Sequence, residues 1–174
     1  MLCTSSQKSG RISAILRFKR DQIIYDIENI CHIEGSAAVE LSPHVRHLIQ
    51  DVAQDGNIDR ISRVLETAVA TAREWLYSHT GRAIDHSELD NELRHCPIFG
   101  IALDLPADFS QTTLVVLQRQ IHEFLVCTAV NEWLDIIAPD RKEKWLLKAL
   151  NAKEAILHTL HRRRTKTRRR SHPF

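Results

Sequence analysis

Residues 57–76 read NIDRISRVLETAVATAREWL, and this stretch decides the fold class. Its apolar side chains recur at intervals of three and four positions: Ile58, Ile61, Leu65, Ala68, Ala72, Trp75 and Leu76. That spacing predicts one amphipathic helix of roughly 30 Å. We expect the Asp55-Gly56-Asn57 turn to precede it, Asn57 to cap it and Gly81 to end it.

Two helices are expected on the N-terminal side of this stretch. The first begins at Asp21, a possible N-cap, carries its apolar stripe to Ile33 and ends at Gly35. The second begins at Ser42-Pro43, because Ser is a good N-cap and Pro fits the first helical position.

Two more helices are expected on the C-terminal side. Asp108 or Ser110 can cap the fourth, which closes before Pro139. Asp140 and Glu143 have the spacing of a capping box that would open the fifth. The predicted buried side of this fifth helix comprises Trp145, Leu146, Ala149, Ile156, Leu157 and Leu160.

Residues 98–105 differ, because apolar side chains alternate there with period two. Alternation predicts a strand, the only one expected. A lone strand needs a partner for its backbone, either a short piece near Val39–Leu41 or a neighbouring subunit. The expected fold is therefore mainly α, a bundle of about five helices with one short strand or hairpin.

Composition favours a soluble globular protein, with 43% hydrophobic and 26% charged residues and no apolar run of membrane-span length. The scattered cysteines, without a CxxC pair, favour a reduced intracellular setting. Residues 1–20 form a basic arm without acids, either a targeting leader or an arm that folds onto a partner. Residues 21–160 form the helical domain, and residues 161–174 a flexible basic tail.

The tail concentrates the positive charge of the chain. Its seven cations are Arg162, Arg163, Arg164, Lys166, Arg168, Arg169 and Arg170. Without them, 17 basic residues stand against 22 acidic ones, so the rest of the chain is acidic. Such a run is expected to be disordered. It could bind nucleic acid through counterion release, dock on an acidic protein ring, or only keep the chain soluble. The terminal Phe174 favours docking.

No catalytic or cofactor-binding pattern is recognised. The chain lacks GxGxxG, GxxxxGK[ST], GxSxG and HExxH motifs, so we expect no enzyme activity, cofactor or metal. Two histidine pairs, two Cys–His combinations and an acidic loop are candidates for a metal site or for catalysis, but a structural role explains each of them better. They are His44 and His47, His158 and His161, Cys127 with His122, Cys96 with His95, and the loop residues Asp85, Glu88, Asp90 and Glu92. The three Trp residues are expected in the core rather than on a partner surface.

Two stretches carry a resemblance: ATAREWLYSHTGRAI (residues 70–84) and LDLPADFSQTTLVVLQRQIHEFLVCTAVNEWL (residues 103–134). They resemble the head–tail connector, or adaptor, proteins of tailed bacteriophages. In that group a helix closes on a turn matched here by Thr80, Gly81 and Arg82, and a long helix introduced by proline, here from Pro106 onward, packs back on it. The stretches RFKRDQIIYDIEN, AQDGNIDRISRVL and HEFLVCTAVNEWL are also similar to uncharacterised proteins of phage-like islands in gut bacteria.

The connector resemblance implies a homo-oligomeric ring of about a dozen copies that bridges portal and tail proteins. It implies a location in the neck of the virion, after assembly in the host cytoplasm, and no membrane. We therefore expect a structural assembly protein whose basic tail engages a partner ring or the passing DNA. The alternative is a helical nucleic-acid-binding, regulator-like protein, in which the second and third helices imitate a helix-turn-helix.

Overall fold

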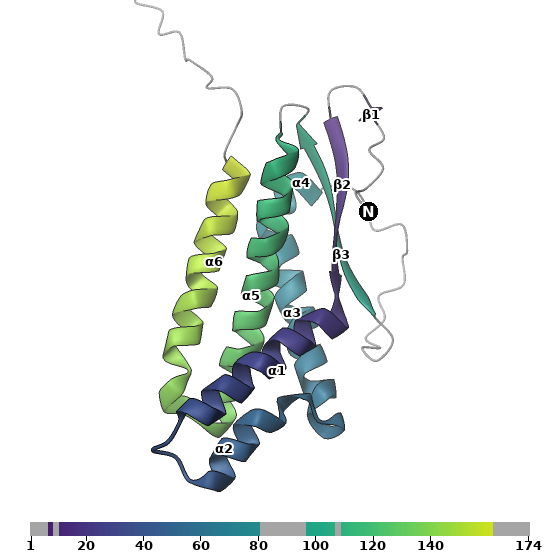
Figure 1. Cartoon of the computed structure of the whole chain (residues 1–174). Helices are drawn as coiled ribbons and strands as arrows, with labels where there is room; N and C mark the ends of the chain where they lie inside the picture. The colour runs from purple at the N-terminus through teal and green to yellow at the C-terminus, as the bar shows by residue number, and fades with distance from the viewer. Residues whose placement is uncertain (1–6, 9–10, 81–96, 107–108, 162–174) are drawn as a thin grey trace, which may run out of the picture.

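The computed structural model describes residues 7–8, 11–80, 97–106 and 109–161. The predicted fold class is confirmed, because the chain is mainly α with a small antiparallel sheet (Figure 1). In chain order the elements are β1 (Gln7–Lys8), β2 (Arg11–Lys19), α1 (Arg20–Ala37), α2 (Pro43–Gln50), η1 (Asp51–Ala53), α3 (Asp55–Trp75), α4 (Tyr77–Thr80), β3 (Ile98–Pro106), α5 (Gln111–Ile137), η2 (Pro139–Arg141) and α6 (Glu143–His161).

The predicted strand is confirmed as β3, but its expected partners are wrong. It pairs antiparallel with β2, in register from Arg11 opposite Pro106 to Lys19 opposite Ile98. Neither Val39–Leu41 nor another subunit is needed, and a stretch that we assigned to a basic arm is part of the sheet. The reason is that β2 also alternates, with Ala14, Leu16 and Phe18 turned inward and charged side chains outward.

The core lies between the sheet and the helices. The inward side chains of β2 and β3 face α3 and α5, and α1 crosses α5 near one end of the bundle. The last helix, α6, packs along α5 on the side away from the sheet (Figure 1). The segment that leads into α6 is also bound to α1. The buried carboxylate of Glu34 forms ion pairs with Arg141 of η2 at 3.3 Å and with Lys144 of α6 at 2.5 Å.

Helix α1 is longer than predicted, because Gly35 does not end it. The helix continues to Ala37, and Gly35 is buried where α1 passes over α2. A Cβ at this position would lie 2.8 Å from the carbonyl oxygen of Arg46, so glycine is present for close approach rather than for helix termination. The start is also different, since Lys19 occupies the N-cap position and Asp21 lies in the first turn.

Helix α3 begins three residues earlier than predicted, at Asp55, with Gln54 rather than Asn57 at the N-cap. The turn between α2 and α3 is made by η1, so Gly56 and Asn57 belong to the first turn of α3. Asn57 is not the cap. Its side-chain amide instead donates to the Asp51 carbonyl oxygen at 2.8 Å and holds η1 against the helix.

Helix α3 ends at Trp75 rather than at Gly81, whereas the start of α2 and both ends of α5 agree with the prediction. Ser42 caps α2 by accepting a hydrogen bond from the Val45 amide at 3.4 Å, as predicted. Helix α5 begins after Ser110 and ends before Pro139. The predicted capping box of the last helix is wrong, because Asp140 lies in η2 and α6 begins only at Glu143. The one-turn helix α4 was not predicted.

Candidate functional site

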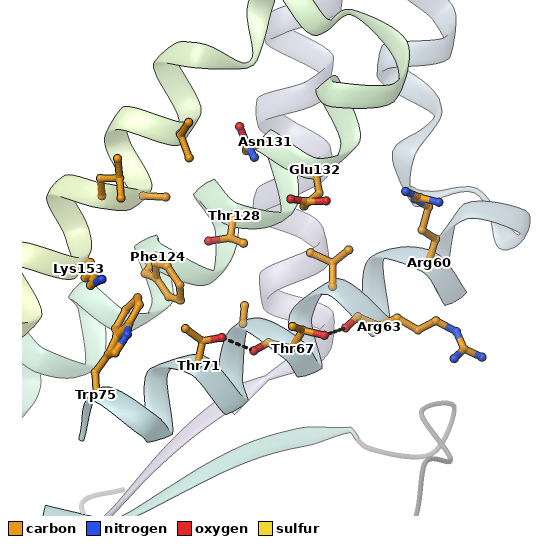
Figure 2. Close-up of a pocket in the computed structure, with 15 residues that line it drawn as sticks. Arg60, Arg63, Thr67, Thr71, Trp75, Phe124, Thr128, Asn131, Glu132 and Lys153 are labelled. Atoms are coloured by element: carbon orange, nitrogen blue, oxygen red, sulfur yellow. Dashed lines mark hydrogen bonds between the residues drawn. The ribbon is translucent and has the colours of Figure 1, made fainter. Parts of the chain in front are cut away.

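A groove of about 620 Å³ lies between α3 and α6, with α5 as its floor (Figure 2). Both outer helices pack on α5, but short side chains such as Thr67, Ala68 and Ala149 face the space between them. These side chains are too small to meet across the groove. The groove therefore remains open along α3 from Arg60 to Trp75, roughly 22 Å at the helical rise.

An aromatic pair closes one end of the groove. Trp75 of α3 packs edge-on against Phe124 of α5, with ring centroids 4.6 Å apart and an interplanar angle of 61°. The ammonium group of Lys153, on α6, lies 5.0 Å from the centre of the Trp75 ring. Trp75 is only partly buried at this end of the groove, whereas Trp133 and Trp145 lie in the core as predicted.

The floor carries polar atoms without partners. The Thr128 hydroxyl and the Asn131 amide oxygen are buried and have no hydrogen-bond partner among the described residues. The hydroxyl groups of Thr67 and Thr71 are already used, because each donates to the backbone carbonyl four residues earlier, at 3.1 and 2.9 Å (Figure 2). The groove is therefore mainly apolar, with a few polar atoms along its floor.

The rim of the groove is cationic. Arg60 and Arg63 project from α3 and Lys153 lies on α6, while Glu132 is the one acidic residue among the described residues that line the groove. On the α6 side, Leu146 and Leu150 are 44% and 48% exposed. Leu146 was predicted to be buried, but no element of the described chain covers it. An apolar floor between positive rims fits an amphipathic segment with acidic flanks.

A second cationic feature lies on a different part of the surface. A depression of about 340 Å³ beside the β2–α1 junction is lined by Arg17 and Lys19 together with Arg119 of α5. Among the described residues, no acidic one lines it. No sequence pattern indicates that Arg119, about a hundred positions away, lies next to Arg17 and Lys19.

Most residues that the sequence singled out lie outside the described residues. These are the tail cations of residues 162–170, Phe174, Gly81 and Arg82 of the connector-like turn, Cys96 with His95, and the acidic loop of residues 85–92. Thr80 is described and ends α4, where its hydroxyl donates to the Tyr77 carbonyl oxygen at 3.4 Å. The tail follows directly after α6, one of the two helices that border the groove.

The histidines and cysteines of the described segments are accounted for structurally. His44, His47 and His158 are exposed, and no cluster of three or more metal-binding side chains occurs there. His122 lies 2.7 Å from an Asp26 carboxylate oxygen and joins α5 to α1.

The two described cysteines, Cys31 and Cys127, are buried and carry free thiols. Burial raises the pKa of Cys31 to about 12 and that of Cys127 to about 11. Neither thiol is therefore prepared to act as a nucleophile.

Comparison with known proteins gives no relative: no family matches the chain, and neither a curated protein nor a solved structure does. No helix within the described ranges is both long and apolar enough to cross a membrane.

Proposed function

We propose that this protein is a structural assembly protein, a ring-forming subunit of the head–tail connector kind that bridges portal and tail proteins in the virion neck. It performs no catalysis of its own. The observation that carries the proposal is the open groove between α3 and α6, which has the shape and lining of a helix-docking surface.

The groove supports assembly because the described residues of a single chain leave its apolar surface uncovered. Leu146 and Leu150 are both nearly half exposed, beside a floor that contains Phe124. Contiguous exposed apolar surface with a polar rim is typical of protein–protein contacts. A helix laid between α3 and α6 would cover it and complete a four-helix arrangement around α5.

The basic tail supports the same function. Helix α6 ends at His161, so the cations that start at Arg162 are attached to a border of the groove. A subunit docked through the groove would therefore carry its tail close to the contact between subunits. From there the tail can reach an acidic partner ring or DNA in a channel.

Light scattering coupled to size exclusion, followed by negative-stain imaging, tests this proposal. We expect one discrete oligomer with a mass that is a multiple of 20.0 kDa, and ring-shaped particles. A protein that stays strictly monomeric, both alone and with a portal-type partner, would refute it.

The depression around Arg17, Lys19 and Arg119 favours a second candidate function, nucleic-acid binding. Three cations without a lining acid can neutralise phosphates, and the tail would add more. A gel-shift series with increasing salt tests this candidate. Removing residues 162–174, or introducing Arg17→Glu with Arg119→Glu, should flatten the dependence of log K on log salt by about 0.9 per lost phosphate contact. An unchanged slope in both variants would exclude it.

A further inference from the structure

We infer that the groove receives the exposed face of α1 from a neighbouring copy of this chain. The inference rests on the proposed ring function and names the segment by which one subunit holds the next.

Helix α1 has the amphipathic outer face that the groove requires. Tyr25 and Ile33 are 58% and 64% exposed, although both are large apolar side chains on one helix. Asp21 and Glu28 are exposed about one turn before and one turn after Tyr25. No Lys or Arg follows Arg20 within the helix, so this face is acidic.

Charge complementarity selects this face over the other exposed apolar helix surfaces. The groove offers Arg60 and Arg63 on one rim and Lys153 on the other. The exposed leucines of α6 lie between cations such as Lys144 and Lys148, so a contact between two copies of α6 would bring like charges together. A copy of α1 instead places Asp21 and Glu28 between the cationic rims.

The length of α1 and its position in the chain are also consistent with docking into the groove of a neighbouring copy. Helix α1 has 18 residues, roughly 27 Å, and the groove runs for roughly 22 Å along α3. Within one chain, α1 packs on a different side of α5, because His122 bonds Asp26 while Phe124 and Thr128 point into the groove. Figure 1 shows α1 crossing in front of α5, with α3 behind.

Each copy therefore presents both halves of the contact, and within the described residues of one chain the two halves do not meet. A contact between two different surfaces is heterologous, and repetition closes it into a ring when the rotation permits. A symmetric dimer through α6 would instead stop at two copies.

Charge reversal tests the inference. Arg60→Glu with Arg63→Glu, or Asp21→Lys with Glu28→Lys, should each raise the subunit concentration needed for assembly about tenfold or more. All four substitutions together should restore part of the lost assembly, because the reversed charges attract at the α3 rim while Lys153 on the other rim keeps its positive charge. Arg17→Glu with Arg119→Glu is the matched control and should assemble as the wild type does. All four positions of the test variants are exposed, and circular dichroism with thermal unfolding checks that each variant is folded.

A carbodiimide cross-link provides an independent measurement, since it joins only amines and carboxylates in direct contact. We expect a Lys153–Glu28 link between light and isotope-labelled subunits of the full-length protein. If wild-type rings form but both single-side variants assemble normally and the link is absent, this inference is refuted while the proposed function stands. If the wild type is monomeric, the proposed function fails as well.

Discussion

At the scale of single residues, Gly35 determines how closely α1 can lie on α2. A Cβ there would be 2.7 Å from Cγ of Gln50 and 2.8 Å from a backbone oxygen that cannot move away freely. We expect Gly35→Ala to lower the free energy of unfolding by about 1–3 kcal/mol, despite the better helix propensity of alanine. Urea unfolding measures this loss.

Gly56 is the matched control, because it is also helical but nothing lies within 4 Å of the Cβ it lacks. Gly56→Ala should leave stability unchanged or raise it by up to about 1 kcal/mol. Equal effects of the two substitutions would show that the contact with α2 does not explain Gly35.

The two buried thiols predict a dependence of stability on alkaline pH. In the folded state the pKa values of Cys31 and Cys127 are about 12 and about 11, against an ordinary value of 9.0. Above that ordinary value the unfolded thiols lose protons that the folded thiols keep, so the free energy of unfolding falls as pH rises. The fall ends once the folded thiols also ionise.

Urea unfolding at about pH 8 and about pH 10 measures this effect. A variant with Cys31→Ala and Cys127→Ala serves as the comparison, because it keeps all other titrating groups. We expect the difference in stability between the two pH values to be smaller in the variant. The same difference in both proteins would contradict the raised pKa values.

At the scale of elements, one side-chain hydrogen bond links α5 to α2. The indole nitrogen of Trp133 donates to the Ile49 carbonyl oxygen at 3.1 Å in the core. Trp133→Phe would leave that carbonyl unpaired and should cost about 1–3 kcal/mol of unfolding free energy. Trp145→Phe is the control, because the buried Trp145 indole nitrogen has no hydrogen-bond partner in the described part of the chain. Chemical denaturation of both variants should give the larger loss for Trp133→Phe.

The sequence predicted helices well wherever apolar spacing and caps agreed, as for α2 with Ser42 and α5 before Pro139. It misplaced ends that depend on tertiary contacts, such as the passage of Gly35 over α2. The strand β2 could have been found, because the buried Ala14, Leu16 and Phe18 alternate with Ser13, Ile15, Arg17 and Lys19, of which only Ile15 is apolar. The positive charges of this stretch predict a basic arm, and this prediction was preferred to the strand that the period-two alternation indicates.

The groove could not have been predicted from the sequence. An apolar stripe has the same sequence pattern whether or not another helix covers it. Leu146 was expected in the core for this reason. Which stripe stays open depends on how far α3 and α6 diverge over α5, and this is decided by packing across the whole bundle. The depression at Arg17 and Arg119 likewise depends on tertiary structure alone.

At the scale of the whole molecule, the N-terminal strand is predicted to be indispensable. Deleting residues 1–19 removes β2 and leaves the backbone of β3 without its ladder partner. We expect this variant to aggregate or to lose cooperative unfolding in circular dichroism. Deleting only residues 1–6 retains β1 and β2 and should have little effect on unfolding. A soluble, cooperatively unfolding protein without residues 1–19 would contradict the structural role of β2.

The pairing of β2 with β3 also constrains how the chain is made. The guanidinium of Arg11 donates a hydrogen bond to the Asp104 carboxylate at 3.2 Å, and Asp104 is synthesised 93 residues after Arg11. At a translation speed of about 5–20 residues per second, β2 remains unpaired for roughly 5–20 s on the ribosome. During that time its apolar face and open edge are available to chaperones and to β2 strands of neighbouring nascent chains. Rare-codon pauses between residues 20 and 98 should therefore lower the soluble yield without changing the folded protein.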